Sequence, residues 1–396
     1  MSPANKEQLV AAYFPFWIFI LLFKLAAGVH YAAIGAIGAT FLPLWTVGLV
    51  VGSISFIECF LIIPIGASLY RIGIFRGLVI GIVASLCSAL CLILPLTFWS
   101  YLASALFSGI AWLFFNPAVD SYLIATAPKQ TIGLLFGIRR ATNSLGVSLG
   151  LILLPLLISL PSQTTGFVMI FPLIGSLASL LFQKNSLPCP PLQPSMVQQK
   201  IAATFFEKIF SVLRLPSMFM ISAYTLFSSL LFASVWFWVP IFIETHPDSQ
   251  ANLGLLLLDA IVIFVGLPIG TFVDAHKKRP IVFLGIALMT IVAFFLSPKY
   301  GLLFVFLCAI ITIADEFTSI SLWSLFPKKM NIGLGTSVVT LMNDLGWTLG
   351  PVSAGYFLSH PETLVSPNIP IGILGIFLLS GALLMLPKVD KDSEKR

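Results

Sequence analysis

The chain has 396 residues, of which 58% are hydrophobic and only 9% are charged. A soluble domain averages about 25% charged residues, so this composition excludes an ordinary water-soluble protein and predicts that lipid covers most of the apolar surface. The net charge of +6 does not indicate a nucleic-acid-binding protein, because the basic residues lie in loops between apolar stretches, where membrane proteins carry them.

Twelve apolar stretches follow one another along the chain, each long enough to cross a bilayer as a helix. The first begins near Tyr13 and is too long for a cleavable signal peptide. We therefore predict an all-α integral membrane protein with spans at residues 13–39, 47–69, 77–97, 100–126, 131–158, 165–183, 217–243, 252–273, 280–297, 301–326, 331–358 and 369–387.

The predicted loops are short except for residues 184–216. This segment begins rich in proline and glutamine, and its end, KIAATFFEKIFSVLRLP, has the apolar spacing of a basic amphipathic helix lying on the membrane surface. We expect a cytoplasmic linker there, joining an N-terminal six-helix bundle (residues 1–183) to a C-terminal six-helix bundle (residues 217–396).

The distribution of basic residues predicts the orientation. Twelve spans place both termini on one side, and nearly all loop lysines and arginines fall on that side, with Lys299 alone opposite. The positive-inside rule then predicts cytoplasmic termini. We expect the chain to lie in a plasma (inner) membrane.

The sequence repeats itself after about half its length. The motif NSLGVSLG at residues 143–150 returns as NDLGWTLG at residues 343–350, and PIG at residues 64–66 returns at residues 268–270. The second and fifth spans therefore correspond to the eighth and eleventh, which predicts two parallel six-helix repeats, an architecture that recurs in secondary transporters.

Small residues in the repeated motif predict close helix packing. Gly146 and Gly150 recur as Gly346 and Gly350, the last followed by Pro351, and glycines four apart let another helix approach closely. The first copy also fits G-x-S-x-G, but a nucleophile elbow needs a strand-to-helix turn, and this stretch lies within an apolar helix. We therefore predict no catalytic residue and no enzymatic activity.

Two further motifs carry a resemblance to a known family. The loop after the second span is similar to the pattern G-x-x-x-D-R-x-G-R-R, and GWTLGPVSAG at residues 346–355 looks like a glycine- and proline-rich helix motif of antiporters. By these motifs and the repeat, the chain resembles the major facilitator superfamily, which implies twelve helices and transport by alternating access. The matching loop positions are Gly66, Arg71, Gly73 and Arg76 in the first half, and Gly270 and Asp274 in the second.

The same resemblance implies that the first of these loops gates the transporter. In the family, a loop arginine reaches an acid at the inner end of the fourth helix, and Arg71 and Asp120 match those places. We interpret Asp120 as structural, because a charge buried in lipid costs about 2.5–3.5 kcal/mol and a partner removes most of that cost.

Ionisable residues inside the spans are the main functional candidates, because such residues are costly in lipid and usually face the interior of the bundle. His30 also lies in a span, and we expect it to be structural. Asp315 and Glu316 are adjacent, so they point about 100° apart and at most one faces the cavity squarely. The charged candidates are Lys24, Glu58, Asp120, Arg139, Arg140, Asp259, Asp315, Glu316 and Asp344.

Depth in the membrane singles out two of these candidates as lying near the middle of the bilayer. A rise of 1.5 Å per residue places Lys24 about 16 Å from the inner end of the first span and Glu58 about 16 Å from the outer end of the second. The resemblance brings the second span against the eleventh, so we expect Glu58 near Asp344. Burial and a neighbouring carboxylate both disfavour the charged form. We hypothesise that Glu58 carries a coupled proton and Asp344 tunes it; a permanent Lys24–Glu58 ion pair is the alternative.

The fifth span carries two arginines. Arg139 shares a helix face with Asn143 and the glycines of the motif, and Arg140 follows it. The planar fork of an arginine at Arg139 suits a carboxylate or a phosphate. The alternative is an ion pair with Asp259 on the eighth span.

These features predict a proton-coupled secondary transporter that exports small amphipathic or cationic compounds. Uptake of a small organic anion is the alternative, favoured by Lys24, Arg139 and Arg140, and a non-transporting sensor or scaffold is the alternative from another class. We expect the lipid bilayer, a small-molecule substrate and protons as partners, no nucleic acid, and a monomer. Cys87 and Cys91 lie one turn apart in a span without histidine or acid, so we expect no metal and no other cofactor.

Single cysteines placed at residues 71–76 and 277–279 test the orientation. We expect them to react with membrane-impermeant thiol reagents only from the cytoplasmic side, because both loops carry the basic residues of that side. Labelling from outside in intact cells contradicts the predicted topology.

Overall fold

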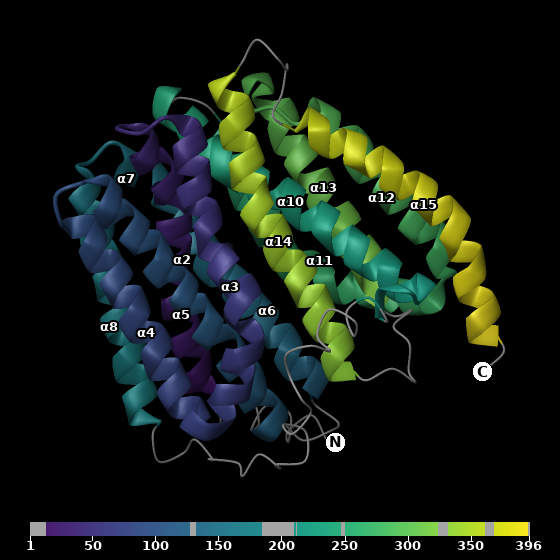
Figure 1. Ribbon diagram of the computed structural model, residues 1–396, viewed down its shortest axis with the longest axis horizontal. Helices are drawn as coiled ribbons and strands as arrows, with labels where there is room; N and C mark the ends of the chain where they lie inside the picture. Colours follow the sequence, from purple (N-terminus) through teal and green to yellow (C-terminus); the bar gives the residue numbers. More distant parts are fainter. Residues whose placement is uncertain are drawn as a thin grey trace. The chain divides into compact units, whose positions relative to one another are not determined.

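The computed structural model describes residues 13–126, 132–183, 210, 212–246, 250–323, 332–360 and 368–394, and every regular element within them is helical. Each predicted span contains one long helix, which confirms the predicted all-helical fold. The linker and most of its expected amphipathic helix lie outside the described residues. The long helices (Figure 1) are α2 (Phe14–Ala39), α3 (Leu44–Ile72), α4 (Ile74–Ile93), α5 (Phe98–Thr126), α6 (Ile132–Ile152), α8 (Ser162–Phe182), α10 (Pro216–Thr245), α11 (Ala251–Ala275), α12 (Lys278–Phe295), α13 (Leu302–Trp323), α14 (Ile332–Ser359) and α15 (Ile369–Glu394).

Length and composition make most of these helices able to cross a membrane on their own. Within the described ranges, nine helices are long and apolar enough to span a bilayer. Two more, α11 and α15, contain shorter apolar stretches at Ala251–Val265 and Ile369–Met385. Polar residues interrupt α14, which carries the second copy of the repeated motif.

The fifth predicted span is broken near its end. Helix α6 stops at Ile152, and the short helix α7 (Leu154–Ile158) begins after Leu153 with a proline in its first turn. That proline, Pro155, has no N–H to donate to the carbonyl four residues earlier, and its ring clashes with that carbonyl. The sequence pattern shows apolar continuity across this point, but the hydrogen-bonded ladder of α6 ends at Ile152.

Gly73 makes the tight turn between α3 and α4. It has φ +90°, a conformation that residues with a side chain rarely adopt. Helix α4 begins at the next residue, so a one-residue connection joins the two helices. A backbone requirement therefore explains this glycine of the loop motif, independently of any gating role.

The chain forms two compact units. Unit 1 comprises residues 1–42 and 60–193, and unit 2 comprises residues 43–59 and 194–396. Helix α3 thus contributes its first part to unit 2 and its second part to unit 1.

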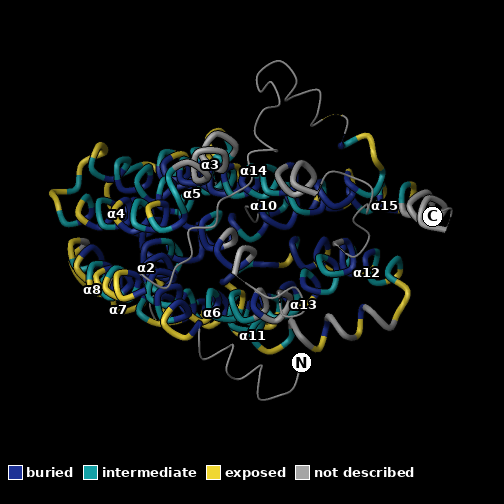
Figure 2. The backbone as a smooth tube through the Cα atoms, turned by 90° about the horizontal axis from the view of Figure 1, so that it is seen from below, coloured by how far each residue is buried: buried dark blue, intermediate teal, exposed yellow. Residues whose placement is uncertain are grey.

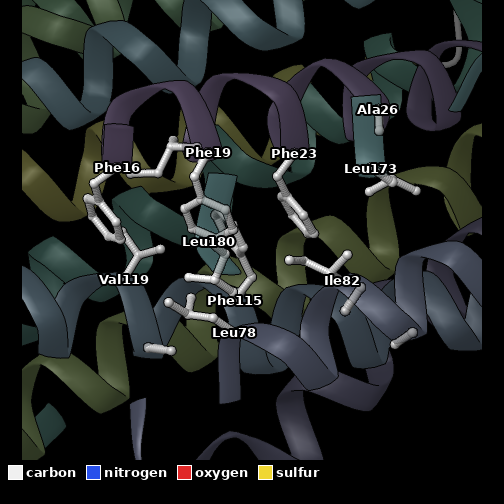
Figure 3. Close-up of a cluster of buried hydrophobic side chains, with 14 of the residues drawn as sticks. Phe16, Phe19, Phe23, Ala26, Leu78, Ile82, Phe115, Val119, Leu173 and Leu180 are labelled. Atoms are coloured by element: carbon white, nitrogen blue, oxygen red, sulfur yellow. The ribbon is translucent and has the colours of Figure 1, made fainter. Parts of the chain in front are cut away.

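An aromatic cluster forms the core of unit 1 (Figure 3). Phe16, Phe19 and Phe23 project from one face of α2 toward α5, where the rings of Phe23 and Phe115 stack with centroids 3.8 Å apart. Residues of α4 and α8 close the cluster, including Leu78 and Leu173. Helix α2 is buried along most of its length, whereas α7 and α8 carry exposed segments (Figure 2). Unit 1 is therefore built around α2.

Glycines hold α6 against α2 at backbone distance. A Cβ at Gly150 would lie 2.6 Å from the Val29 amide nitrogen, and a Cβ at Gly28 would lie 2.6 Å from the Val147 carbonyl oxygen. Real Cβ atoms do not approach backbone atoms so closely. In unit 2, Gly346 and Gly350 meet α10 in the same way. These four-residue glycine spacings mark the sites of closest helix approach.

Substitution of Gly150 by alanine tests this packing. We expect Gly150→Ala to destabilise the protein by about 1–3 kcal/mol, because the new methyl group meets backbone atoms that cannot move out of its way. Gly381 on α15 is the matched control, since a Cβ there would meet nothing within 4 Å, and Gly381→Ala should be neutral or slightly stabilising. Thermal unfolding of the purified protein in detergent measures both, and equal melting temperatures would contradict the close approach.

Candidate functional site

Lys24 occupies a polar position within the apolar interior of unit 1. Its side chain is only 3% exposed, and its ammonium donates a 3.3 Å hydrogen bond to Asn116 Oδ1. The same nitrogen lies 3.7 Å from the centroid of the Trp112 ring and 5.1 Å from that of Phe115. A cation against the face of an aromatic ring is stabilised by the negative charge of that face. Helix α5 thus supplies a lining that accommodates a buried cation.

His30 lies among three serines between α2, α4 and α5. Its Nε2 is 3.1 Å from Ser104 Oγ and 3.2 Å from Ser88 Oγ, and its Nδ1 is 3.3 Å from Ser108 Oγ. Ser88 donates its proton to the Ser104 carbonyl, so the Ser104 hydroxyl is the donor available to Nε2. A ring with its proton on Nδ1 then satisfies the network. This geometry gives His30 a structural function, tying three helices together.

Helix α6 carries the sequence-predicted arginines. Arg139 and Asn143 are half-buried, while Arg140 is exposed. The Asn143 Oδ1 atom is buried and has no hydrogen-bond partner among the residues that the structure describes. Arg139 belongs to unit 1 and Asp259 to unit 2, so their ion pair remains a prediction.

Asp315 anchors a polar cluster in unit 2. Its Oδ1 accepts hydrogen bonds of 2.6 Å from both the Tyr224 hydroxyl and the Ser228 hydroxyl of α10. Through these two bonds, Asp315 of α13 is joined directly to α10. The neighbouring Glu316 is 1% exposed and Asp315 is half-buried, so the two adjacent acids have different surroundings, as their angular separation predicts.

Asp344 is buried on α14 beside the repeated asparagine. Its side chain is 4% exposed, and its Oδ1 accepts a 3.1 Å hydrogen bond from Asn343 Nδ2. Asn343 Oδ1 in turn accepts a 2.7 Å bond from Ser229 of α10. A short polar chain therefore connects α10 with the carboxyl group of Asp344.

The first part of α3 packs on α14 within unit 2. A Cβ at Gly52 would lie 2.5 Å from the Thr348 carbonyl oxygen, and Gly48 approaches Pro351 equally closely. Further along α3, the Cys59 sulfur is 4.0 Å from Thr348 Oγ1. The Cys59 thiol also lies within electrostatic range of both Asp344 and Glu58. Glu58 precedes Cys59 in the chain, and its expected closeness to Asp344 remains a prediction.

The two units repeat each other at the level of single contacts. The glycines at positions 146 and 346 meet equivalent atoms of α2 and α10, which lie 205 residues apart in the sequence. A Cβ on the first would meet the Leu21 carbonyl, the Lys24 Cβ and the Leu25 amide, and a Cβ on the second would meet the Leu226 carbonyl, the Ser229 Cβ and the Leu230 amide. Lys24 and Ser229 therefore occupy equivalent positions.

The same correspondence extends to α5 and α13. Phe115 lies against Phe19 and Phe23, and Asp315 lies against Tyr224 and Ser228; both pairs of partners are 205 residues apart. Asp315 thus stands where unit 1 has Phe115, Glu316 stands where it has Asn116, and Asp344 stands where it has Ser144. Three acids of unit 2 replace neutral residues of unit 1.

The predicted gating positions are described only in part. Gly73 makes the turn given above, and Arg76 is exposed on α4. At side-chain level the other predicted positions lie outside the described residues, so the contact from Arg71 to Asp120 remains a prediction. These positions are Gly66, Arg71, Asp120, Gly270 and Asp274.

Sequence reasoning missed the partners of the buried charges. These partners are neutral residues within strongly apolar spans: Trp112 and Asn116 on α5, and Tyr224, Ser228 and Ser229 on α10. The sequence did contain a signal for these partners. Each α10 residue corresponds to the α2 residue numbered 205 lower, and the two residues contact equivalent neighbours. The sequence repeat was visible in the fifth and eleventh spans but not in the first and seventh.

The comparisons with known proteins now decide the family. A family model described as Major Facilitator Superfamily matches residues 9–351. The chain belongs to the major facilitator superfamily. This membership identifies a multi-pass membrane protein of the secondary transporters rather than an enzyme, embedded in a lipid bilayer and acting on a small molecule.

Solved structures share the fold of this superfamily member at low sequence identity. A mutant of the nucleoside transporter NupG is similar with a TM-score of 0.68 and 15% identity, covering 96% of this chain and 99% of that one. A POT family transporter in complex with a thioalcohol-conjugated peptide is similar with a TM-score of 0.69 and 14% identity, covering 95% and 96%. No curated protein matches the sequence significantly.

Substitution of His30 tests its structural assignment. We expect His30→Leu to lower the free energy of unfolding by about 1–3 kcal/mol, because the hydroxyls of Ser104 and Ser108 lose their ring partner in a buried site. Ser353→Ala is the matched control, since that hydroxyl bonds only the Gly350 carbonyl of its own helix. Thermal unfolding checks both variants. A His30→Leu protein that melts like the control would show that the network contributes no stability.

Proposed function

We propose that the chain is a proton-coupled secondary transporter that exports small amphipathic or cationic compounds by alternating access. One observation carries the proposal: acids of unit 2 stand where unit 1 has neutral residues. Unit 1 packs its equivalent helices with Phe115, Asn116 and Ser144, so helix packing does not require Asp315, Glu316 and Asp344. An acid that lies in a membrane and is not needed for packing is a functional candidate.

Carboxylates in a transporter interior bind both protons and cationic groups. A proton and a substrate cation that use the same carboxylates compete, so binding of one favours release of the other. An inward proton gradient then drives the cation outward by exchange. The outward direction follows from this competition in a plasma membrane that carries an inward proton gradient, which is the location we expect for this chain. We propose a monomer as the working unit.

Uptake of a small organic anion is the second candidate, and the buried Lys24 favours it. Its ammonium already has an amide oxygen and an aromatic face as partners, which makes it less suited to release and rebind an anion in each cycle. The exporter is therefore the preferred function.

Transport by the purified protein in liposomes tests the proposal. With an imposed pH gradient, we expect cationic amphipathic compounds to move against their gradient in exchange for protons, and a protonophore to abolish the flux. We expect Asp315→Asn to weaken cation binding at least tenfold, about 1.4 kcal/mol, with Ser353→Ala unchanged. Proton-driven uptake of anions would support the second candidate, and no flux of any compound in the panel would contradict transport of these classes.

A further inference from the structure

One oxygen of Asp344 has no hydrogen-bond partner in the part of the chain that the structure describes. Asn343 holds Oδ1, while Oδ2 is buried and receives no donor. With 4% of the side chain exposed, neither bulk water nor lipid supplies a partner. A buried carboxylate oxygen without a donor leaves its charge uncompensated, which is costly. A proton on Oδ2 removes that charge.

The carboxyl group is held in a fixed orientation. Ser229 of α10 donates to Asn343 Oδ1 at 2.7 Å, and Asn343 Nδ2 donates to Asp344 Oδ1 at 3.1 Å. Gly346 and Gly350, which follow Asp344 on the next turns of α14, bring this helix into backbone contact with α10. Oδ1 is thereby engaged by a neutral donor, which leaves Oδ2 as the oxygen available to a proton.

On α3, the titratable thiol of Cys59 interacts electrostatically with Asp344, and the titratable Glu58 is the residue before it. Glu58 is 9% exposed and carries the same charge sign as Asp344 when ionised. On α10, Ser229 bonds the adjacent Asn343 and does not titrate, and Tyr224 is directed to Asp315 instead. The surroundings of Asp344 therefore include no cation among the contacts described here.

The repeat shows that the fold does not need an acid at this position. Ser144 is the equivalent residue in unit 1, and it is buried next to Gly146 and Gly150, which pack on α2 as Gly346 and Gly350 pack on α10. The asparagine before it is common to both copies. The aspartate is thus an addition to a packing arrangement that is complete with serine.

We propose that Asp344 is the residue that binds and releases the coupled proton, and that Ser229 and Asn343 are its positioning residues. The inference rests on the proposed proton-coupled function and moves the role of proton carrier from Glu58 to Asp344. When water reaches the site from the side of high proton concentration, Oδ2 accepts a proton and the site becomes neutral. When water reaches it from the other side, the proton returns to water and the charged carboxylate remains. No other bond forms or breaks in this step.

Neutralising Asp344 separates exchange from coupling. In liposomes we expect Asp344→Asn to retain substrate exchange between the two sides and to lose at least tenfold in transport driven by a pH gradient. Asp344→Ser, the residue of the equivalent position in unit 1, provides a second variant whose packing unit 1 already demonstrates. Ser353→Ala is the matched control and should keep both activities.

The outcomes distinguish this inference from the proposed function. If the wild-type protein shows no flux driven by a pH gradient, the proposed function itself fails. If the wild type is coupled and both Asp344 variants stay coupled at the wild-type rate, the assignment of Asp344 is wrong. Loss of coupling in Glu58→Gln with retention in Asp344→Asn would return the role to Glu58.

Two readouts test the carboxyl group and its positioning directly. Infrared difference spectra across a pH change should contain carbonyl stretches of protonated carboxyls in the wild type, and one component of these should be lost in Asp344→Asn while the bands of the other acids remain. Ser229→Ala removes the donor to Asn343, so the pH midpoint of gradient-driven transport should change while exchange persists. Carboxyl bands that are unchanged in Asp344→Asn, or a midpoint that is unaltered in Ser229→Ala, would contradict the respective assignment.

Discussion

Backbone-to-backbone contact between helices is the constraint on which both units depend. In each unit a motif helix, α6 or α14, meets the unit's first full-length helix, α2 or α10, at glycines four residues apart. No side chain fits between these helices, so their separation and rotation are fixed by the backbone itself. Residues on the neighbouring faces then acquire defined positions, and Lys24 in unit 1 and Ser229 in unit 2 are held at equivalent places by the same contact.

Because the glycines fix the geometry, the surrounding polar residues are free to differ between the repeats. Unit 1 fills the positions next to α2 with stacked rings and one cation covered by Trp112. Unit 2 fills the equivalent positions with hydroxyls and carboxyl groups. The packing motif is therefore informative about fold, whereas the differences between the two copies are informative about chemistry.

The sequence predicted the helices well because a lipid environment demands long apolar stretches and leaves few alternatives. It did not predict the break before Pro155, because hydropathy continues across that residue while the hydrogen-bond ladder does not. For the site, sequence identified the charged residues but not their neutral partners. Asn116 and Ser229 look like ordinary polar residues of a span until the contact of Gly146 and Gly346 shows which position of α2 matches which position of α10.

The contrast between Phe115 and Asp315 has a consequence for hydration. Stacked rings such as Phe23 and Phe115 exclude water, and no water molecule can substitute for their contact area. A water molecule can take the place of a hydroxyl donor at Asp315 with little loss of hydrogen bonding. Water that enters the interior would therefore leave the aromatic core of unit 1 intact, but it would weaken the contact between α10 and α13 in unit 2. By this argument unit 1 stays dry and rigid, and unit 2 is the one that responds to solvent.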